Sequence, residues 1–119
     1  MTAPLRPADD DAAARRKRVL DLALKYQTLV IEDDPYGDLY FDAAPPPSLL
    51  NLSATVPGSR ELLVHCGSLS KVLSPGLRVG WMIAPAELLG KATMCKQFSD
   101  AHTSTFAQAT AAQYLKAGR

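Results

Sequence analysis

The stretch LLVHCGSLSKVLSPGLRVGWMIA, residues 62–84, predicts two strands joined by a polar turn. Residues 62–66, LLVHC, read as a short strand that is buried on both faces. Residues 78–84 read as a second strand. Because only about a dozen residues separate the two runs, a helical crossover does not fit between them. We therefore expect these two strands to pair antiparallel.

The sequence before this stretch predicts a helix and a strand. Residues 11–26, DAAARRKRVLDLALKY, carry apolar side chains at helical spacing. Residues 28–31, TLVI, read as a strand buried on both faces, and acidic residues follow it at once. Two further helices are expected downstream, over 86–98 and 104–117. The fold class is therefore α/β, with a mostly parallel sheet, one antiparallel strand and helices packed on it.

Two segments are interpreted as solvent-facing, and two residues are candidate caps of the last helix. Residues 41–60 are rich in Pro, Ser and Asn and predict a surface excursion. The basic run over residues 15–18 is interpreted as the solvated face of the first helix rather than a nucleic-acid patch. Thr103 or Ser104 can cap the last helix.

Composition excludes several classes of protein. The 119 residues are 47% hydrophobic and 21% charged with a net charge of +1, which favours one soluble globular domain. Such a balance argues against a dedicated nucleic-acid or anionic-membrane binder. No apolar run approaches the roughly 18 residues of a membrane span, and the opening MTAPLRPADDD is not a signal peptide.

The cysteines and histidines predict neither disulfides nor a metal site. Cys66 and Cys95 stand far apart and fit reduced thiols in a cytoplasmic protein. His65 and His102 lack partners at ligand spacing, apart from Cys66 beside His65. Neighbouring residues on a strand point to opposite faces, so that pair cannot share one metal ion.

Lys71 is the centre of the most informative motif, Ser68-Leu69-Ser70-Lys71. A phosphate-binding P-loop would need GxxxxGK[ST], which this chain does not contain. The SxxK pattern of acyl-serine hydrolases is present, but its supporting SDN and KTG elements are not. Two interpretations remain: a solvated surface lysine, or a lysine that becomes nucleophilic because its charge is partly desolvated at the end of a buried strand.

The residues around Lys71 suit one cofactor, pyridoxal 5'-phosphate. Its phosphate needs hydroxyls and a guanidinium, which Ser68, Ser70 and Arg78 offer. Its pyridine nitrogen needs a carboxylate and its ring oxygen needs a donor, which Asp33 and Tyr36 offer from the end of the other strand. Asp33 and Asp34 also have a plainer interpretation, as caps of a turn before Pro35.

Three strings, IEDDPYGDLYF, SLSKVLSPGLRVGW and DAHTSTFAQ, resemble the fold-type I pyridoxal-phosphate aminotransferases. The resemblance is narrower to the class I/II branch that contains 2-aminoadipate, kynurenine and aromatic aminotransferases, and it covers residues 15–119. It implies that Lys71 forms the Schiff base with the cofactor and that Asp33 pairs with the pyridine nitrogen. Asp33, rather than Asp34, stands three residues before Tyr36, as the family pattern requires.

The same resemblance implies roles for the remaining residues. Tyr36 would bond the ring oxygen, and Ser68, Ser70 and Arg78 would hold the phosphate. The substrates would be an amino acid and a 2-oxo acid, and the full-length protein would be a homodimer. The segment around Thr103 would lie near the dimer interface.

The chain departs from the family pattern in its extent. Relatives of this kind are several hundred residues long, and APLRPADDD stands where they carry an Asn-Pro-Thr-Gly element. Residues 1–119 are therefore expected to be a partial cofactor-binding large domain, without its N-terminal part and without the C-terminal small domain. Such a fragment is expected to be inactive alone.

The substrate and the class of parent protein stay open at this point. 2-Aminoadipate, an aromatic amino acid or a branched-chain amino acid all fit, and one cofactor supports other bond cleavages on the same scaffold. The alternative is a transcriptional regulator whose aminotransferase-like effector domain binds the cofactor without transamination. Those regulators tend to read EDDYDSE after the strand, whereas this chain reads EDDPYGD over residues 32–38, which favours the enzyme.

Overall fold

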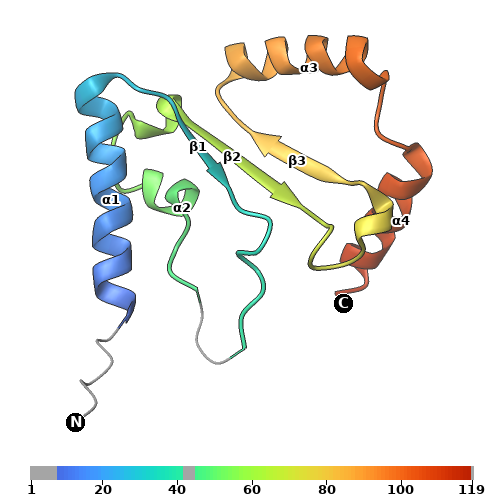
Figure 1. Ribbon diagram of the computed structural model, residues 1–119, viewed down its shortest axis with the longest axis horizontal. Coiled ribbons are helices and arrows are strands. Elements are labelled where there is room, and N and C mark those ends of the chain that lie inside the picture. Colours follow the sequence, from blue (N-terminus) through green and yellow to red (C-terminus); the bar gives the residue numbers. More distant parts are fainter. Residues whose placement is uncertain (1–7, 42–44, 119) are drawn as a thin grey trace.

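A three-stranded sheet of order β1-β2-β3 runs through the middle of the molecule (Figure 1). The computed structural model describes residues 8–41 and 45–118. Its strands are β1 (Val30–Asp33), β2 (Leu63–Ser68) and β3 (Gly80–Ile83). Its helices are α1 (Ala8–Tyr26), α2 (Leu49–Ser53), α3 (Ala86–Asp100) and α4 (Thr105–Lys116), with short 3-10 turns η1 (Ser59–Leu62) and η2 (Pro75–Leu77).

The strand pairing confirms the predicted α/β sheet. β1 and β2 are parallel, with Val30 opposite Leu63 and Asp33 opposite Cys66. β2 and β3 are antiparallel, and Ser68 lies opposite Gly80. β1 begins two residues later than its predicted start at residue 28, and β2 runs two residues beyond its predicted end at residue 66. Three strands thus give one parallel and one antiparallel pair.

The hydrophobic core lies between one face of the sheet and helices α1 and α2. Leu20 of α1, Leu49 of α2, Val56 and Leu63 of β2 form its buried cluster. The prediction that residues 41–60 are only a surface excursion is therefore wrong. The helix α2 brings Leu49 under the sheet, and burying such a side chain contributes about 1.5–3 kcal/mol.

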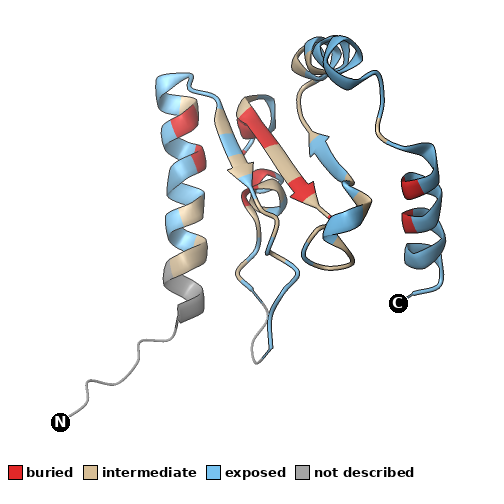
Figure 2. Ribbon diagram, turned by 45° about the vertical axis from the view of Figure 1, so that its right-hand side comes forward, coloured by how far each residue is buried: buried red, intermediate tan, exposed pale blue. Residues whose placement is uncertain are grey.

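The prediction that β1 is buried on both faces is also wrong. Ile31, on the face opposite the core, is 65% exposed. A tryptophan on a predicted strand is expected to be a core residue. Trp81 of β3 is instead exposed, as is Met82 beside it. In the described chain the helices that pack on the sheet, α1 and α2, cover one face of β1 and β2 (Figure 2).

The C-terminal helices extend the molecule rather than enclosing the sheet. The radius of gyration is 17.2 Å, against about 13.5 Å for a compact chain of this length. No residue of α3 is buried, and α4 buries only Ala107 and Ala111. The last helix, α4, starts as predicted, because the Ser104 hydroxyl accepts a hydrogen bond from the Ala107 amide at 3.3 Å.

One residue of the basic run does not face solvent freely, which corrects part of that prediction. Arg16 donates from Nη1 to the carbonyls of Pro46 and Pro47, at 2.8 Å each, and so ties α1 to the segment before α2. Lys17 and Arg18 are exposed as expected. Within residues 8–41 and 45–118, no helix is both long and apolar enough to cross a membrane. The opening residues 1–7, where we predict no signal peptide, lie outside the described part.

Leu63→Ala is expected to lower the free energy of unfolding by about 2–5 kcal/mol, because it removes three carbons from the centre of the core and leaves a cavity. Leu63 is 2% exposed. Chemical denaturation measures the change. The matched control is Leu115→Ala on α4, where the side chain is 60% exposed and little change is expected. A loss at Leu63 no larger than that of the control would show that the core is placed wrongly.

Candidate active site

The carboxyl ends of the two parallel strands bring two predicted site residues to one edge of the sheet. Asp33 is the last residue of β1 and lies opposite Cys66. Ser68 is the last residue of β2, two positions further along. The Asp34 amide donates to the Cys66 carbonyl at 2.9 Å, which continues the ladder one step past β1. Ligands of open α/β sheets bind at this edge.

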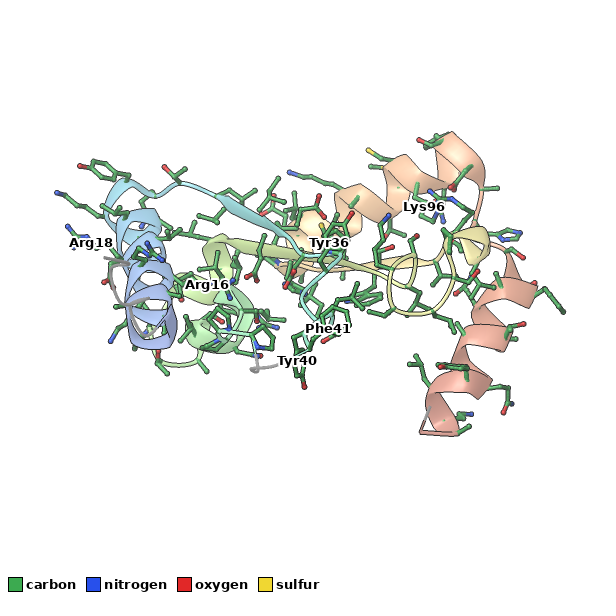
Figure 3. All side chains as sticks on the ribbon, turned by 60° about the horizontal axis from the view of Figure 1, so that its bottom comes forward. Arg16, Arg18, Tyr36, Tyr40, Phe41 and Lys96 are labelled. Carbon is green, nitrogen blue, oxygen red and sulfur yellow. The ribbon has the colours of Figure 1, made fainter. Side chains whose placement is uncertain are left out.

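Tyr36 and Lys71 meet at the same edge, although they come from different strand ends. The Lys71 ammonium lies 5.5 Å from the centroid of the Tyr36 ring, within the range of a cation–π contact. Tyr36 lies just beyond the end of β1 (Figure 3). Both side chains are exposed. The expected desolvation of Lys71 is thus not present, because Lys71 sits in an open turn after β2.

The turn that carries Lys71 is stabilised by its own hydrogen bonds. The Ser68 hydroxyl accepts from the Ser70 amide at 3.1 Å. The amides of Leu73 and Ser74 both donate to the Leu69 carbonyl at 3.0 Å, and the Leu69 amide donates to the Val79 carbonyl at 3.0 Å. Ser68 and Ser70 are therefore held close together beside Lys71. Two neighbouring hydroxyls of this kind suit a phosphate group.

The Arg78 guanidinium is hydrogen-bonded to the Pro75 carbonyl rather than to the two serines. Its backbone is left-handed, with φ +54°, and Nη1 donates to the Pro75 carbonyl at 3.4 Å. Its side chain lines a cavity of about 440 Å³ with His102 and Phe106, between η2 and the start of α4. Among the described residues, no hydrogen bond joins Arg78 to Ser68 or Ser70.

The two neighbouring aspartates differ in their surroundings. The Asp34 carboxylate occupies the space that a Cβ at Gly37 would fill, so it is packed against the turn that follows β1. Asp33 is exposed at the sheet edge. Asp34 is thus the aspartate that packs on the turn, and Asp33 is the exposed carboxylate at the end of β1.

A close approach on β2 also depends on glycine. The Trp81 indole lies against Gly67, where any Cβ would overlap the ring. Gly67 is opposite Trp81 in the antiparallel pair. The indole therefore covers the β2 backbone immediately before Ser68.

Sequence reasoning missed one pair, Glu32 and His65. The Glu32 carboxylate and His65 Nδ1 are 2.8 Å apart, although sequence spacing predicts no carboxylate partner for His65. The parallel register places the two residues opposite each other. The available signal was that Glu32 directly follows one predicted strand while His65 lies in another strand of a mostly parallel sheet. The described residues contain no group of three or more His, Cys, Asp or Glu side chains that could hold a metal ion.

The donor set at this edge fits pyridoxal 5'-phosphate. A primary amine, a phenol, a carboxylate and two hydroxyls come from the ends of two adjacent parallel strands. These are the groups that hold an aldehyde cofactor with a phosphate, a ring oxygen and a basic ring nitrogen. Lys71, Tyr36, Asp33, Ser68 and Ser70 supply these groups, while the Arg78 guanidinium is hydrogen-bonded to the Pro75 carbonyl.

Comparison with known protein families gives one match that covers most of the chain. The family model described as aminotransferase class I and II matches residues 12–118. The chain belongs to that family. Aminotransferases of this class use pyridoxal 5'-phosphate, so the resemblance stated from the three sequence strings is confirmed.

The relatives include an aminotransferase and a transcriptional regulator, which are the two classes of parent protein that the sequence leaves open. The 2-aminoadipate transaminase of Thermus thermophilus is 43% identical over 105 residues, which cover 87% of this chain and 25% of that protein. An HTH-type transcriptional regulator of Bacillus subtilis is 36% identical over 104 residues, covering 87% of this chain and 20% of the regulator.

A solved aminotransferase structure confirms the fold. The α-aminoadipate aminotransferase of Thermus thermophilus, complexed with N-(5'-phosphopyridoxyl)-L-leucine, superimposes with a TM-score of 0.81 at 40% identity. The match covers 88% of this chain and 26% of that structure. The chain thus spans about a quarter of the length of the relatives that it matches.

Proposed function

We propose that the protein carrying this chain is a pyridoxal-phosphate-dependent aminotransferase that moves an amino group between an amino acid and a 2-oxo acid. The observation that carries the proposal is the meeting of Lys71 with Tyr36 at the strand edge that also ends in Asp33 and Ser68. The family match supports it.

Each side chain has a distinct task in this proposal. Lys71 Nζ would hold the cofactor, and the same amine would be the base that takes the proton from the substrate Cα. The Asp33 carboxylate keeps a proton on the pyridine nitrogen, and the Tyr36 hydroxyl donates to the ring oxygen. Ser68 and Ser70 bind the phosphate, and the Arg78 guanidinium joins them once it leaves the Pro75 carbonyl, to which Nη1 donates at 3.4 Å. When bound, pyridoxal 5'-phosphate supplies an electron sink that stabilises negative charge at Cα.

We further propose that residues 1–119 form part of a cofactor-binding large domain and that the full-length enzyme is a cytoplasmic homodimer. Large exposed apolar side chains support burial in an assembly, because a stable monomer rarely leaves so many in contact with water. Phe98 of α3 is 87% exposed and Phe106 of α4 is 80% exposed. Small-molecule amino acids and 2-oxo acids are the proposed partners, with neither nucleic acid nor membrane.

The test uses the full-length protein, purified with pyridoxal 5'-phosphate and given a panel of amino acids with 2-oxoglutarate. The panel contains 2-aminoadipate, an aromatic amino acid and a branched-chain amino acid, so that it also selects the substrate class. Formation of the matching 2-oxo acid and glutamate in equal amounts supports the proposal. Cofactor binding without turnover on any substrate would contradict it.

Residues 1–119 alone are expected not to sustain transamination. Lys71, Asp33 and Tyr36 are all exposed, and the proposed set contains no arginine for the substrate carboxylate. Positioning and exclusion of water contribute several kcal/mol in reactions of this kind, so a solvated half-site loses most of the rate. The measurement is oxo-acid formation by the purified 119-residue chain with added cofactor. Repeated turnover by a monodisperse sample, abolished by Lys71→Ala, would show that this expectation is wrong.

A regulator that binds the cofactor without turnover is the second candidate. The 36% identity to an HTH-type transcriptional regulator favours it, while the sequence EDDPYGD over residues 32–38 favours the enzyme. The gene sequence upstream of this chain separates the two. A winged-helix domain there, together with cofactor-dependent DNA binding by the full-length protein, would replace the enzyme by the regulator. A glycine-rich loop followed by Asn-Pro-x-Gly would favour the enzyme.

A further inference from the structure

The Glu32 carboxylate joins three segments of the chain. Its Oε1 accepts a hydrogen bond from the Leu49 amide at 2.7 Å. Its Oε2 accepts from the Leu50 amide at 3.2 Å and lies 2.8 Å from His65 Nδ1. One carboxylate on β1 thus binds the first amides of α2 and a side chain of β2.

The Glu32–His65 pair is largely shielded from water, so water does not readily replace a hydrogen-bond partner that is lost. The side chains of His65 and Glu32 are 13% and 11% exposed. Because an ionised carboxylate only accepts hydrogen bonds, His65 Nδ1 carries the proton that lies between them. A shielded carboxylate with several donors has one favoured placement, since any shift leaves a donor without an acceptor.

Glu32 and Asp33 project from opposite faces of β1. Side chains alternate along a strand, so Glu32 faces α2 while Asp33 projects from the opposite face of β1. The Asp34 amide, one residue further, bonds to Cys66 directly after His65 on β2. The strand end that leads to Asp33 and Tyr36 is therefore fixed from the side away from the site.

We propose that Glu32, held by His65, is a positioning residue that fixes the end of β1 and so the placement of Asp33 and Tyr36 against Lys71. The inference rests on the proposed function only in its reference to the cofactor. Its structural part, the fixing of the strand end, concerns the protein with or without cofactor. Neither Glu32 nor His65 touches the cofactor under this proposal.

The first test measures hydrogen exchange at the Asp34 amide in the cofactor-free full-length protein. Glu32→Gln keeps the shape of the side chain but offers fewer acceptors to the same donors, so exchange at Asp34 is expected to rise about tenfold or more. Glu87→Gln is the matched control, because Glu87 pairs with Lys91 on the exposed face of α3 at 2.9 Å. Equal exchange at Asp34 in both variants and the wild type would overturn the proposal.

The second test asks whether the hydrogen bond from His65, rather than the bulk of its ring, is what matters. His65→Asn retains an N–H donor near the position of Nδ1, and His65→Leu retains bulk without a donor. His65→Leu is expected to weaken cofactor binding about tenfold or more and to change the visible circular dichroism of the bound cofactor. His65→Asn is expected to keep most of the cofactor affinity and most of the circular dichroism signal of the wild type. Equal cofactor binding and equal circular dichroism of the two His65 variants would overturn the proposal. If Glu32→Gln does not fold, the comparison of these two variants decides the positioning role.

The two proposals fail in different ways. A wild-type protein that binds no cofactor would refute the aminotransferase function, while exchange at Asp34 would still decide the role of Glu32. A wild-type enzyme that is active, with Glu32→Gln equal to it in Asp34 exchange and in circular dichroism, would refute only the positioning role.

Discussion

Lys71→Ala is expected to lower the transamination rate of the full-length protein at least about a thousandfold, because one amine both holds the cofactor and moves the Cα proton. The rate of 2-oxo acid formation at saturating substrate measures it. The large effect is specific to a lysine at the strand edge, where Nζ lies 5.5 Å from the Tyr36 ring centroid.

Lys91→Ala is the matched control for that loss. Lys91 lies on α3 and pairs with Glu87, and its side chain is 68% exposed. Its removal is expected to leave the rate unchanged, as exposed ion pairs of this kind contribute little. Comparable rates for Lys71→Ala and Lys91→Ala would show that Lys71 is a solvated surface lysine without a catalytic role.

Asp33→Asn is expected to lower the rate about 100- to 1000-fold, because an amide cannot supply the negative charge that keeps the ring nitrogen protonated. Asp34→Asn is expected to change it far less, since the Asp34 carboxylate packs against the turn at Gly37. Steady-state rates of the two variants, each saturated with cofactor, measure the difference. The reverse order of effects would move the ring-nitrogen role to Asp34.

The sheet and its connections are predictable because they follow from local rules. The short gap between the apolar runs at 62–66 and 78–84 excludes a crossover, and β2 and β3 are indeed antiparallel. Strand ends collect polar residues at one edge, and Asp33 and Ser68 end β1 and β2 there. Pattern and chain length are sufficient for inferences of this kind.

Burial is less predictable, because an apolar run does not say how many layers cover it. The run at 28–31 predicts a strand covered on both faces, yet Ile31 is 65% exposed beside the buried β2. Conversely, Leu49 follows Pro45-Pro46-Pro47 in a segment that resembles a loop, and it packs in the core. Tertiary contacts decide both cases.

The site residues divide in the same way. Lys71 and Tyr36 are predicted from their residue types and from their positions just after two predicted strands. The structure brings them together. The contact between Glu32 and His65 spans 33 positions and depends on the register of β1 against β2, which no local pattern supplies. Arg78 is assigned to the phosphate by residue type and by resemblance, and in the structure its Nη1 donates to the Pro75 carbonyl.

Borohydride reduction of the cofactor-loaded protein, followed by mass spectrometry of its peptides, tests the role of Lys71 most directly. Reduction makes the link between an amine and pyridoxal 5'-phosphate permanent, so the modified lysine can be identified without any assay of activity. We predict a single phosphopyridoxyl group on Lys71, within the turn over residues 68–73. Modification of another lysine, or of many surface lysines equally, would contradict this assignment.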